Sequence, residues 1–292
     1  MSNKIKILIG CLSFKNFTGS EMYIYELSKY LTQLDCDVTI TSPNLGDPLV
    51  SLAQKNGIKI HNFDTQLLTQ IFDIIHTQHK PITEALVKAF PNIKKITTIH
   101  SEVISLENPV MDNSILKYIA IRPEIKDHLI NNFNIPKDKI EVIYNPIDSN
   151  RFNPTNTTDN GYVLFVGTID YLRQKSIEDL VEYTKNIGKE LWLVGKNSSY
   201  YLSGLLENSH VKYYEDTYNV EDFVKNCSET AGILLGRTTI EGWMCGKPGW
   251  IYNVNSLGEI ISKDRFEVPS DISKFDGMEV AKKIKEEYIK IL

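Results

Sequence analysis

The segment 236–242 combines residue types that suit a nucleotide. It follows an apolar run and opens a helical pattern, and backbone N–H groups at a helix start attract phosphate. Arg237 adds a fixed positive charge, and Thr238 and Thr239 carry hydroxyl groups that can donate hydrogen bonds. The Glu241 carboxylate suits two vicinal hydroxyls, as on ribose, or else it complements the helix dipole. The segment therefore predicts a phosphate-binding helix start and leaves the role of Glu241 open.

Glycines end four of the apolar runs along the chain, namely Gly10, Gly167, Gly195 and Gly236. In an open parallel sheet, ligands bind beyond the carboxyl ends of the strands. Glycine lets the backbone turn sharply at such an end and approach a ligand closely. A single one of these glycines needs no more than a tight turn to explain it. Four of them, at matching strand ends in two domains, favour a binding cleft.

Several common fingerprints are absent from the sequence. No G-x-G-x-x-G follows the first apolar run, and no G-x-S-x-G is present, which argues against a nicotinamide dehydrogenase and an α/β hydrolase. The segment 242–247 approaches a P-loop, but it has three intervening residues, and Pro248 occupies the place of the magnesium-binding Ser or Thr. His76 and His79 lack an adjacent carboxylate. We therefore expect no metal site.

Apolar runs alternate with helical patterns through most of the chain, as they do in βαβ units. The runs predict strands at 5–9, 38–41, 58–62, 71–76, 96–100, 118–121, 140–144, 162–166, 191–194, 231–235 and 250–252. Two successive arrays of this kind predict an α/β protein. We expect two Rossmann-like, doubly wound domains that face each other across a cleft.

The boundary between the two arrays is predicted in residues 148–160, which are rich in Asn, Thr, Asp and Pro and so favour turns. We place an N-terminal Rossmann-like domain at 1–150 and a C-terminal one at 151–275. Residues 276–292 predict a C-terminal helix that can pack back on the N-terminal domain. One side of this helix carries Val280, Ala281, Ile284, Tyr288 and Ile291.

Composition narrows the class of partner. The 292 residues are 42% hydrophobic and carry a formal net charge of −5, which is typical of a globular protein and disfavours nucleic acid. The four cysteines form no C-x-x-C pair, as expected for reduced thiols. The N-terminus shows no signal peptide, and no run reaches the length of a membrane span. We expect a cytoplasmic protein with at most peripheral membrane contact.

At its phosphate-binding segment the chain resembles the GT-B glycosyltransferases, specifically the large retaining family four. That family has an E-x7-E pattern followed by G-x-P, and Glu241, Gly246, Lys247 and Pro248 match its second half. The resemblance implies that the C-terminal domain holds a nucleotide-sugar donor and that the N-terminal domain faces the acceptor. It further implies that Glu241 binds the ribose and that residues 236–239 approach the diphosphate.

The resemblance extends over nearly the whole chain. The segment 18–21 resembles the family's glycine-rich loop, where Gly19 would lie against the donor phosphate or the acceptor. His100 matches a histidine at a strand end that faces the transferred sugar. Residues 143–154 resemble the interdomain signature, and the segment 165–167 followed by Lys175 resembles a phosphate-binding segment.

The chain departs from the family pattern at three positions. Ile233 occupies the place of the first glutamate, which contacts the donor sugar in the family. Thr168 replaces an arginine after Gly167, and Ser176 replaces a glycine after Lys175. Arg173 is close enough in the sequence to substitute for the missing arginine.

These residues predict a transferase mechanism. Cleavage of the sugar nucleotide develops negative charge on the β-phosphate, and positive groups placed there favour the transition state. We assign this role to Lys175, assisted by Arg173 or Arg237, and expect His100 to bond a hydroxyl of the transferred sugar. The predicted donor-binding residues are Gly19, Gly167, Thr168, Gly195, Gly236, Arg237, Thr238, Thr239 and Glu241.

The resemblance implies retention at the anomeric carbon and catalysis without a metal. No cofactor is expected beyond the nucleotide-sugar co-substrate, for which a UDP- or GDP-sugar is favoured. The acceptor is not identified and is a glycan, a lipid-linked sugar or a protein. Two alternatives stay open, namely a non-catalytic sugar-nucleotide-binding subunit, motivated by Ile233, and a GT-B sugar-nucleotide epimerase. An epimerase would act on sugar nucleotides without an acceptor.

Overall fold

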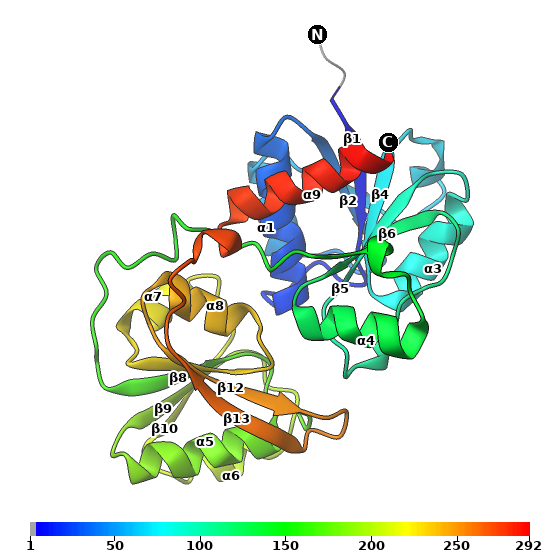
Figure 1. The fold of residues 1–292 in the computed structure, drawn as a ribbon. Coiled ribbons are helices and arrows are strands. Elements are labelled where there is room, and N and C mark those ends of the chain that lie inside the picture. Colours follow the sequence, from blue (N-terminus) through cyan, green and yellow to red (C-terminus); the bar gives the residue numbers. More distant parts are fainter. Residues whose placement is uncertain (1–3) are drawn as a thin grey trace. The chain divides into compact units, whose positions relative to one another are not determined.

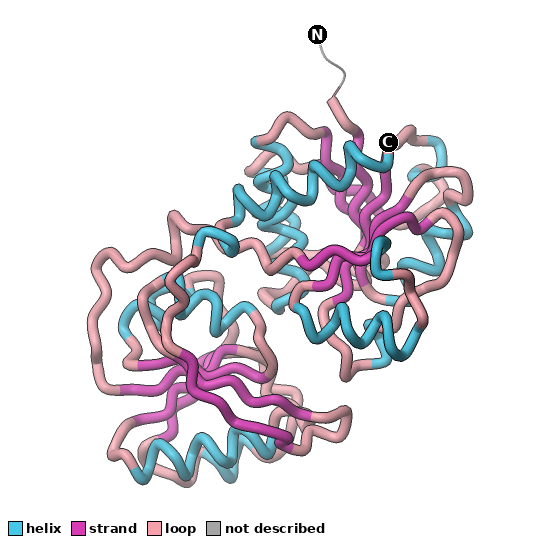
Figure 2. Tube along the Cα trace, in the orientation of Figure 1, coloured by secondary structure: helices cyan, strands magenta, loops and turns pink. Residues whose placement is uncertain are grey.

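The structure is a computed structural model that describes residues 4–292, and these residues divide into two compact units. The first unit contains residues 4–16, 20–146 and 277–292. The second unit contains Phe17–Gly19 and Ile147–Asp276. Each unit is built on one β-sheet with helices on its faces (Figure 2). Apart from residues 17–19, the chain therefore forms most of the first unit, then the second unit, and returns to the first at residues 277–292.

The first unit has a seven-stranded parallel sheet in the order β3-β2-β1-β4-β5-β6-β7 (Figure 1). Its strands are β1 (Lys6–Gly10), β2 (Asp37–Ser42), β3 (Lys59–Asn62), β4 (Ile74–Gln78), β5 (Lys95–Ile99), β6 (Ile115–Ala120) and β7 (Ile140–Val142). The inner strands are buried on both faces, which is why they read as continuous apolar runs rather than as alternating ones. The strand order reverses between β1 and β4, where a doubly wound sheet binds its ligands.

The helices of the first unit are α1 (Gly19–Gln33), α2 (Leu49–Lys55), α3 (Lys80–Ala89), α4 (Pro123–Phe133) and α9 (Gly277–Ile291), with 3₁₀ turns η1 (Leu67–Thr69), η2 (Ser105–Glu107) and η3 (Lys137–Lys139). Pro123 occupies the first turn of α4, where its missing N–H costs nothing. Asn134 ends α4 in the left-handed conformation with φ of +53°. At the end of β1, a Cβ on Gly10 would lie 2.2 Å from Leu86 Cδ1 of α3. The absence of a side chain at Gly10 thus leaves room for Leu86 of α3 at this end of the sheet.

Helix α9, the last element of the chain, packs on the first unit beside α1 (Figure 1). A Cβ on Gly277 would lie 2.1 Å from Tyr30 Cε2, so the two helices approach closely at the start of α9. Lys285 Nζ donates a 2.7 Å hydrogen bond to the Leu34 carbonyl oxygen. Tyr288 is fully buried, and its hydroxyl lies 2.6 Å from His76 Nδ1 in β4. Because α9 covers it, α1 is buried over most of its circumference.

The second unit has a six-stranded sheet in the order β10-β9-β8-β11-β12-β13. Its strands are β8 (Tyr162–Val166), β9 (Glu190–Val194), β10 (Val211–Tyr214), β11 (Glu229–Ile233), β12 (Gly249–Val254) and β13 (Ile260–Phe266). All neighbours run parallel except β13, which pairs antiparallel with β12. The strand order reverses between β8 and β11, so this sheet also has a switch point.

The helices of the second unit are α5 (Gln174–Asn186), α6 (Leu202–Leu205), α7 (Val220–Asn226) and α8 (Arg237–Met244), with the 3₁₀ turn η4 (Ser273–Phe275). Figure 1 shows α5 and α6 on one face of the sheet and α7 and α8 on the other. The apolar stripe of α5, with Ile177, Leu180 and Val181, joins the strands in the core. Helices therefore cover both faces of the sheet, and the strand ends at its switch point lie between these two layers (Figure 1).

The structure corrects several expected elements. The strand expected at 71–76 begins only at Ile74, and Ile71 is 75% exposed. The strand expected at 231–235 ends at Ile233, because Leu234 turns the chain with φ of +58°. The sequence pattern missed β10 and β13. Strand β13 lies at the sheet edge and is largely exposed, so it lacks the apolar run that marks the inner strands.

Candidate functional site

Two glycines lie together at the carboxyl ends of β8 and β9 in the second unit. Gly195 has φ of +148°, and a Cβ atom on it would lie 2.1 Å from the Gly167 carbonyl oxygen. The Gly167 N–H donates a 2.9 Å hydrogen bond to the Val194 carbonyl oxygen, so the segments that follow β8 and β9 stay paired beyond the ends of the two strands. The surface at this edge of the sheet is therefore formed by backbone atoms without side chains, and a ligand can approach it closely.

Helix α8 begins next to these glycines. Beyond Ile233, Leu234 turns the chain, and Gly236 is the N-cap residue of α8. The Thr238 hydroxyl donates a 2.7 Å hydrogen bond to the Val166 carbonyl oxygen at the end of β8. This bond fixes the first turn of α8 against the switch point. The first N–H groups of a helix have no partner within the helix, so this turn is suited to an anion.

The threonine hydroxyls of this turn are directed into the protein. Thr239 is fully buried, and its hydroxyl has no hydrogen-bond partner among the described residues. A Cβ on Gly232 would lie 2.7 Å from that oxygen. With the Thr238 hydroxyl bonded to β8, the donors that this turn can still offer to a phosphate are its backbone N–H groups and the Arg237 side chain.

Arg237 and Glu241 form an ion pair along α8. Nη2 and Nε of Arg237 lie 2.8 and 3.1 Å from the same carboxylate oxygen, Glu241 Oε1. Glu241 is only 4% exposed, although it belongs to the first turns of the helix. A buried carboxylate needs such a partner because its transfer out of water is costly. A cation and a carboxylate are thus fixed side by side at the helix start.

The two cations after β8 have different surroundings. Arg173 pairs with Asp170 through Nη1, and its Nε lies 4.0 Å from the position of a Cβ on Gly167. Lys175 is 57% exposed, and its Nζ lies 3.5 Å from Glu259 Oε1 in the turn between β12 and β13. Arg173 is therefore the cation that lies against the strand-end glycine.

The remaining donor-binding candidates are placed as follows. Thr168 follows Gly167 and is half-buried. Gly19 is grouped with the second unit, and a Cβ on it would lie 4.0 Å from Arg237 Cδ. Gly167, Gly195, Gly236, Arg237, Glu241 and Arg173 all lie at the carboxyl edge of the second sheet.

In the first unit, the switch point carries a polar network that includes His100. His100 follows β5, and its Nε2 lies 2.6 Å from Gln78 Oε1 at the end of β4. Its backbone N–H donates a 3.1 Å hydrogen bond to Glu107 Oε2. Burial is the main reason that the pKa of His100 lies well below its ordinary value, and nearby His79, His76 and Arg122 lower it further. The ring is neutral at pH 7.

His79 and Glu107 form a buried pair beside His100. His79 Nε2 lies 3.3 Å from Glu107 Oε1, and both side chains are almost completely buried. Burial raises the pKa of Glu107 to about 7 and lowers the pKa of His79 to about 4. His79 Nδ1 has no hydrogen-bond partner among the described residues, and φ of His79 is +66°. No sequence pattern connects position 79 with position 107, so this pair could not be predicted from the sequence.

The raised pKa of Glu107 predicts a measurable pH dependence of folding. The pKa of Glu107 in the folded protein is higher than its ordinary value of 4.5, so the folded protein binds the proton more tightly than the unfolded chain does. The free energy of unfolding therefore falls as the pH rises from about 4.5 to 7. We expect Glu107→Gln to remove this loss and to stabilise the protein at pH 8 by up to about 3 kcal/mol. Urea denaturation at pH 5.5 and 8 measures the change.

The matched control for Glu107→Gln is Glu182→Gln, which alters an exposed glutamate of α5. This control should follow the wild-type pH dependence. If Glu107→Gln also followed it, the carboxyl group would titrate normally and the assignment of its raised pKa would be wrong.

A second buried chain of hydrogen bonds lies beneath His100. His76 Nε2 lies 2.7 Å from Thr98 Oγ1, which lies 3.0 Å from the Tyr23 hydroxyl. Tyr23 contacts His100 edge-on, with ring centroids 4.8 Å apart. His76 is thus a core histidine with both ring nitrogens bonded, since Tyr288 occupies the other one. It is not available as a metal ligand.

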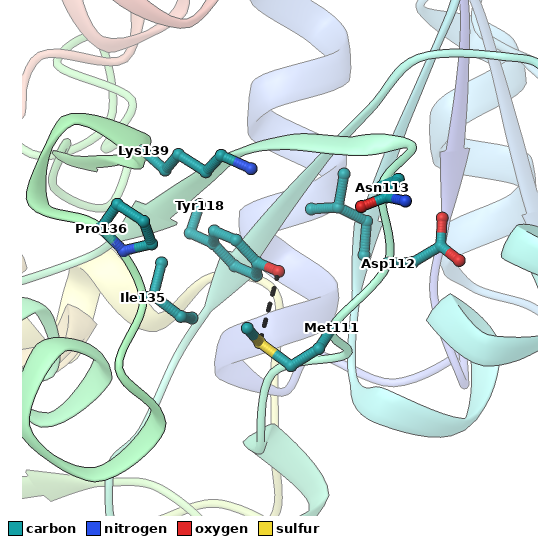
Figure 3. A pocket seen from close by; sticks show the side chains of 8 residues that line it. Met111, Asp112, Asn113, Tyr118, Ile135, Pro136 and Lys139 are labelled. Atoms are coloured by element: carbon teal, nitrogen blue, oxygen red, sulfur yellow. Dashed lines mark hydrogen bonds between the residues drawn. The ribbon is translucent and has the colours of Figure 1, made fainter.

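A cavity of about 290 Å³ lies elsewhere in the first unit (Figure 3). Met111, Asp112, Tyr118, Pro136 and Lys139 line it, together with Asn113, Ile115 and Ile135. Apart from Tyr118, which lies inside β6, these residues precede β6 or β7 or begin β6, so the cavity lies towards the amino ends of the strands. The candidate residues lie at the carboxyl ends, where parallel sheets bind ligands. The cavity therefore does not belong to the candidate site.

Neither a metal site nor a membrane span is found in the described chain. Within residues 4–292, no three His, Cys, Asp or Glu side chains are grouped so that they could hold a metal ion. Across the same residues, every helix is too short or too polar to cross a lipid bilayer.

A comparison with known families matches part of the chain. Residues 17–151 match a family model described as Glycosyltransferase Family 4. A search of curated proteins found no significant match to the chain.

Solved structures share the fold over almost the whole chain. A glycosyltransferase from Rickettsia africae is 19% identical with a TM-score of 0.65, and the match covers 99% of this chain and 89% of that one. Anabaena Alr3699/HepE, solved with UDP-glucose, is 15% identical with a TM-score of 0.75, over 99% and 100% of the two chains. A mutant of S. aureus TarM, solved with fondaparinux, α-GlcNAc-glycerol and UDP, is 10% identical with a TM-score of 0.64, over 98% and 96%.

These matches confirm the α/β fold class with two parallel-sheet domains and the resemblance that was inferred from the sequence. The fold is GT-B, and the matched family domain covers residues 17–151.

Proposed function

We propose that this chain, a glycosyltransferase by its family domain and its GT-B fold, transfers a sugar from a UDP-sugar to a hydroxyl group of an acceptor. One observation carries the proposal, namely the Arg237–Glu241 pair at the start of α8, beside the glycines that end β8 and β9. It offers a cation, a carboxylate and backbone N–H groups within one helical turn of each other. UDP is preferred because Anabaena HepE and S. aureus TarM were solved with UDP or UDP-glucose.

Each part of the second-unit site has a proposed task. The backbone N–H groups of the first turn of α8 bind the diphosphate, with Arg237 and Arg173 as its cations. Both hydrogen bonds that Arg237 donates to Glu241 reach Oε1, so Glu241 Oε2 can accept hydrogen bonds from the ribose hydroxyls. When the sugar–phosphate bond breaks, charge develops on the β-phosphate, and these fixed positive groups stabilise it more than the ground state.

The remaining parts of the proposal rest on the resemblance and on the first unit. His100 binds a hydroxyl of the transferred sugar. Transfer proceeds with retention and without a metal ion, because the cations take the place of magnesium. The acceptor is a glycan, a lipid-linked sugar or a protein. The proposed compartment is the cytoplasm, which suits the four buried, unpaired cysteines.

The surroundings of Arg173 and Lys175 predict that they differ in importance. Arg173→Ala should lower kcat/KM by about 10²–10³-fold, because Arg173 lies against Gly167 at the strand end. Lys175→Ala should cost less than about tenfold, because an exposed ion pair contributes little. Steady-state transfer from UDP-glucose measures both, with Lys185→Ala on the exposed side of α5 as control. The reverse order would make Lys175 the diphosphate cation.

Donor binding tests the proposal most directly. Calorimetric titration with UDP-, GDP-, ADP- and CMP-sugars should show binding of the UDP-sugars, unchanged in excess EDTA. Glu241→Gln should weaken binding of the UDP-sugar more than binding of pyrophosphate, since its proposed contact is the ribose. Failure of every nucleotide sugar to bind would overturn the proposal, and loss of binding in EDTA would overturn its metal-free form.

A non-catalytic sugar-nucleotide-binding subunit is the second candidate, and Ile233 favours it. Its side chain packs against the apolar core of the second unit, where the family has a carboxylate facing the donor sugar. A transferase hydrolyses its donor slowly when no acceptor is present, whereas a pure binding protein does not. Prolonged incubation with UDP-glucose, followed by measurement of released UDP, separates the two.

A further inference from the structure

The Gln78 side chain is fully buried at the carboxyl end of β4 and is bonded at both ends. Its Nε2 donates a 3.2 Å hydrogen bond to the Ser20 carbonyl oxygen in α1. A carbonyl oxygen only accepts, so the NH₂ group of the amide must face Ser20. The amide oxygen of Gln78 then faces His100 Nε2 at 2.6 Å. The orientation of the amide is therefore fixed by the backbone of α1.

This orientation determines which nitrogen of His100 carries the proton. Because Gln78 Oε1 only accepts, His100 Nε2 must donate and must be protonated. In the neutral ring the other nitrogen, Nδ1, then carries a lone pair. Within the described residues no group bonds Nδ1, and His100 is only half-buried. His100 thus offers a hydrogen-bond acceptor to a ligand.

The surroundings of His100 keep its ring neutral. His76, His79 and Arg122 lie near it, and burial and these groups hold the pKa of His100 well below its ordinary value. Arg122 is itself paired with Glu102. From η2, Glu107 accepts the backbone N–H of His100, and from α1 the Tyr23 ring packs edge-on against it. The Nδ1 lone pair is therefore present at pH 7.

We propose that Gln78 is a positioning residue that holds His100 in the Nε2–H tautomer, so that Nδ1 accepts a hydrogen bond from a hydroxyl of the transferred sugar. The ligand contact rests on the proposed function, whereas the tautomer does not. The consequence is a substrate class. A sugar that has a hydroxyl group facing His100 Nδ1 is accepted, because the hydroxyl can donate a hydrogen bond. A sugar with a carboxylate in that place, such as a uronic acid, is disfavoured because the carboxylate oxygens face the Nδ1 lone pair and cannot donate.

The tautomer can be measured in the unmodified protein. Long-range ¹H–¹⁵N correlation NMR distinguishes protonated from unprotonated ring nitrogens, and His100→Asn identifies the His100 signals. We expect Nε2–H with unprotonated Nδ1 between pH 6 and 8. In Gln78→Met, which is of similar size but lacks the acceptor, a mixture of tautomers is expected. Gln54→Met, on the exposed side of α2, is the matched control and should match the wild type. An Nδ1–H tautomer in the wild type would overturn the inference.

Binding of fluorinated donors tests the role of the tautomer. In UDP-glucose, each sugar hydroxyl is replaced in turn by fluorine, which cannot donate a hydrogen bond, and Kd is measured by titration. In the wild type we expect one analogue to bind about tenfold more weakly, the equivalent of one hydrogen bond. In Gln78→Met this loss should fall to less than about threefold, because the acceptor is no longer fixed.

The outcomes separate this inference from the proposed function. If no UDP-sugar binds while NMR finds the Nε2–H tautomer, the proposed function fails and the role of Gln78 in setting the tautomer stands. If UDP-glucose binds and every fluorinated analogue binds equally well, the proposed ligand contact of His100 is wrong. An equal loss in wild type and Gln78→Met would remove Gln78 from the contact.

Discussion

Substituting Arg237 by alanine is expected to lower the rate of sugar transfer by about 10²–10³-fold, the usual effect of removing a donor aimed at developing charge. Arg237 occupies the first position of α8, where the helix dipole and the backbone N–H groups point to the same place. The kcat for transfer from UDP-glucose should fall by more than the affinity for UDP, because the charge on the β-phosphate grows in the transition state.

The same substitution also affects folding, because Arg237 is the ion-pair partner of Glu241. Loss of Arg237 leaves a buried carboxylate unpaired, at a cost of about 3 kcal/mol or more. The double variant Arg237→Met with Glu241→Gln removes both charges and should recover most of the stability without recovering transfer. Lys80→Ala breaks an exposed pair with the same spacing on α3 and should change neither property.

Thermal unfolding and transfer rates measured on these variants give separate answers. If the double variant regained both stability and activity, the Arg237–Glu241 pair would be a structural feature of α8 only. Sugar transfer at the wild-type rate in Arg237→Ala would lead to the same conclusion about the pair.

Replacing Gly195 by alanine is expected to lower the free energy of unfolding strongly. The new Cβ would lie 2.1 Å from the carbonyl oxygen and 2.8 Å from the carbonyl carbon of Gly167. Both are backbone atoms at the end of a buried strand, so no side chain can rotate away. In addition, φ of +148° is rarely adopted by residues with a Cβ. We expect a cost of about 3 kcal/mol or more and loss of donor binding.

Gly204→Ala is the matched control for this experiment. Gly204 lies in α6 of the same unit, and a Cβ there meets nothing within 4 Å. Alanine at this position should be neutral or should stabilise by about 0.5–1 kcal/mol, because it favours the helix. Urea denaturation of both variants measures the difference. A Gly195→Ala protein as stable as the control would show that the two strand ends can separate at little cost.

The sequence predicted the fold because the buried strands carry a strong signal. Strands such as β4 and β8 are covered on both faces, so they appear as continuous apolar runs of predictable position. An edge strand such as β13 has no such run, since much of its surface is exposed to water. Its place in the sheet depends on pairing with β12, which is a tertiary property.

Residue types within the candidate site were easier to predict than the directions of their side chains. The sequence singled out the segment 236–239, but it suggested that the hydroxyls of Thr238 and Thr239 face phosphate. In the structure, Thr238 bonds the end of β8 and Thr239 is buried, because α8 packs that side of its first turn on the sheet. Similarly, the sequence assigned the main cationic role to Lys175 and an assisting role to Arg173, whereas the surroundings of the two side chains favour the reverse order.

The polar groups around His100 could not be predicted from the sequence, because they come from distant segments. Gln78 follows an apolar strand and Glu107 lies in a short 3₁₀ turn, and neither forms a motif with position 100. They meet only when β4 and β5 pair and the loop after β5 folds back onto the sheet.

Helix α9 has a consequence for the order of events during synthesis on a ribosome. Except for residues 17–19, the second unit is encoded as one continuous stretch, whereas the first unit needs residues 277–292, which are synthesised after the whole of the second unit. Until then, the surface of α1 beneath α9 and the buried nitrogen of His76 that meets Tyr288 have no cover. Although domains made first usually fold first, the first unit of this chain reaches its final form only after the second unit has been synthesised.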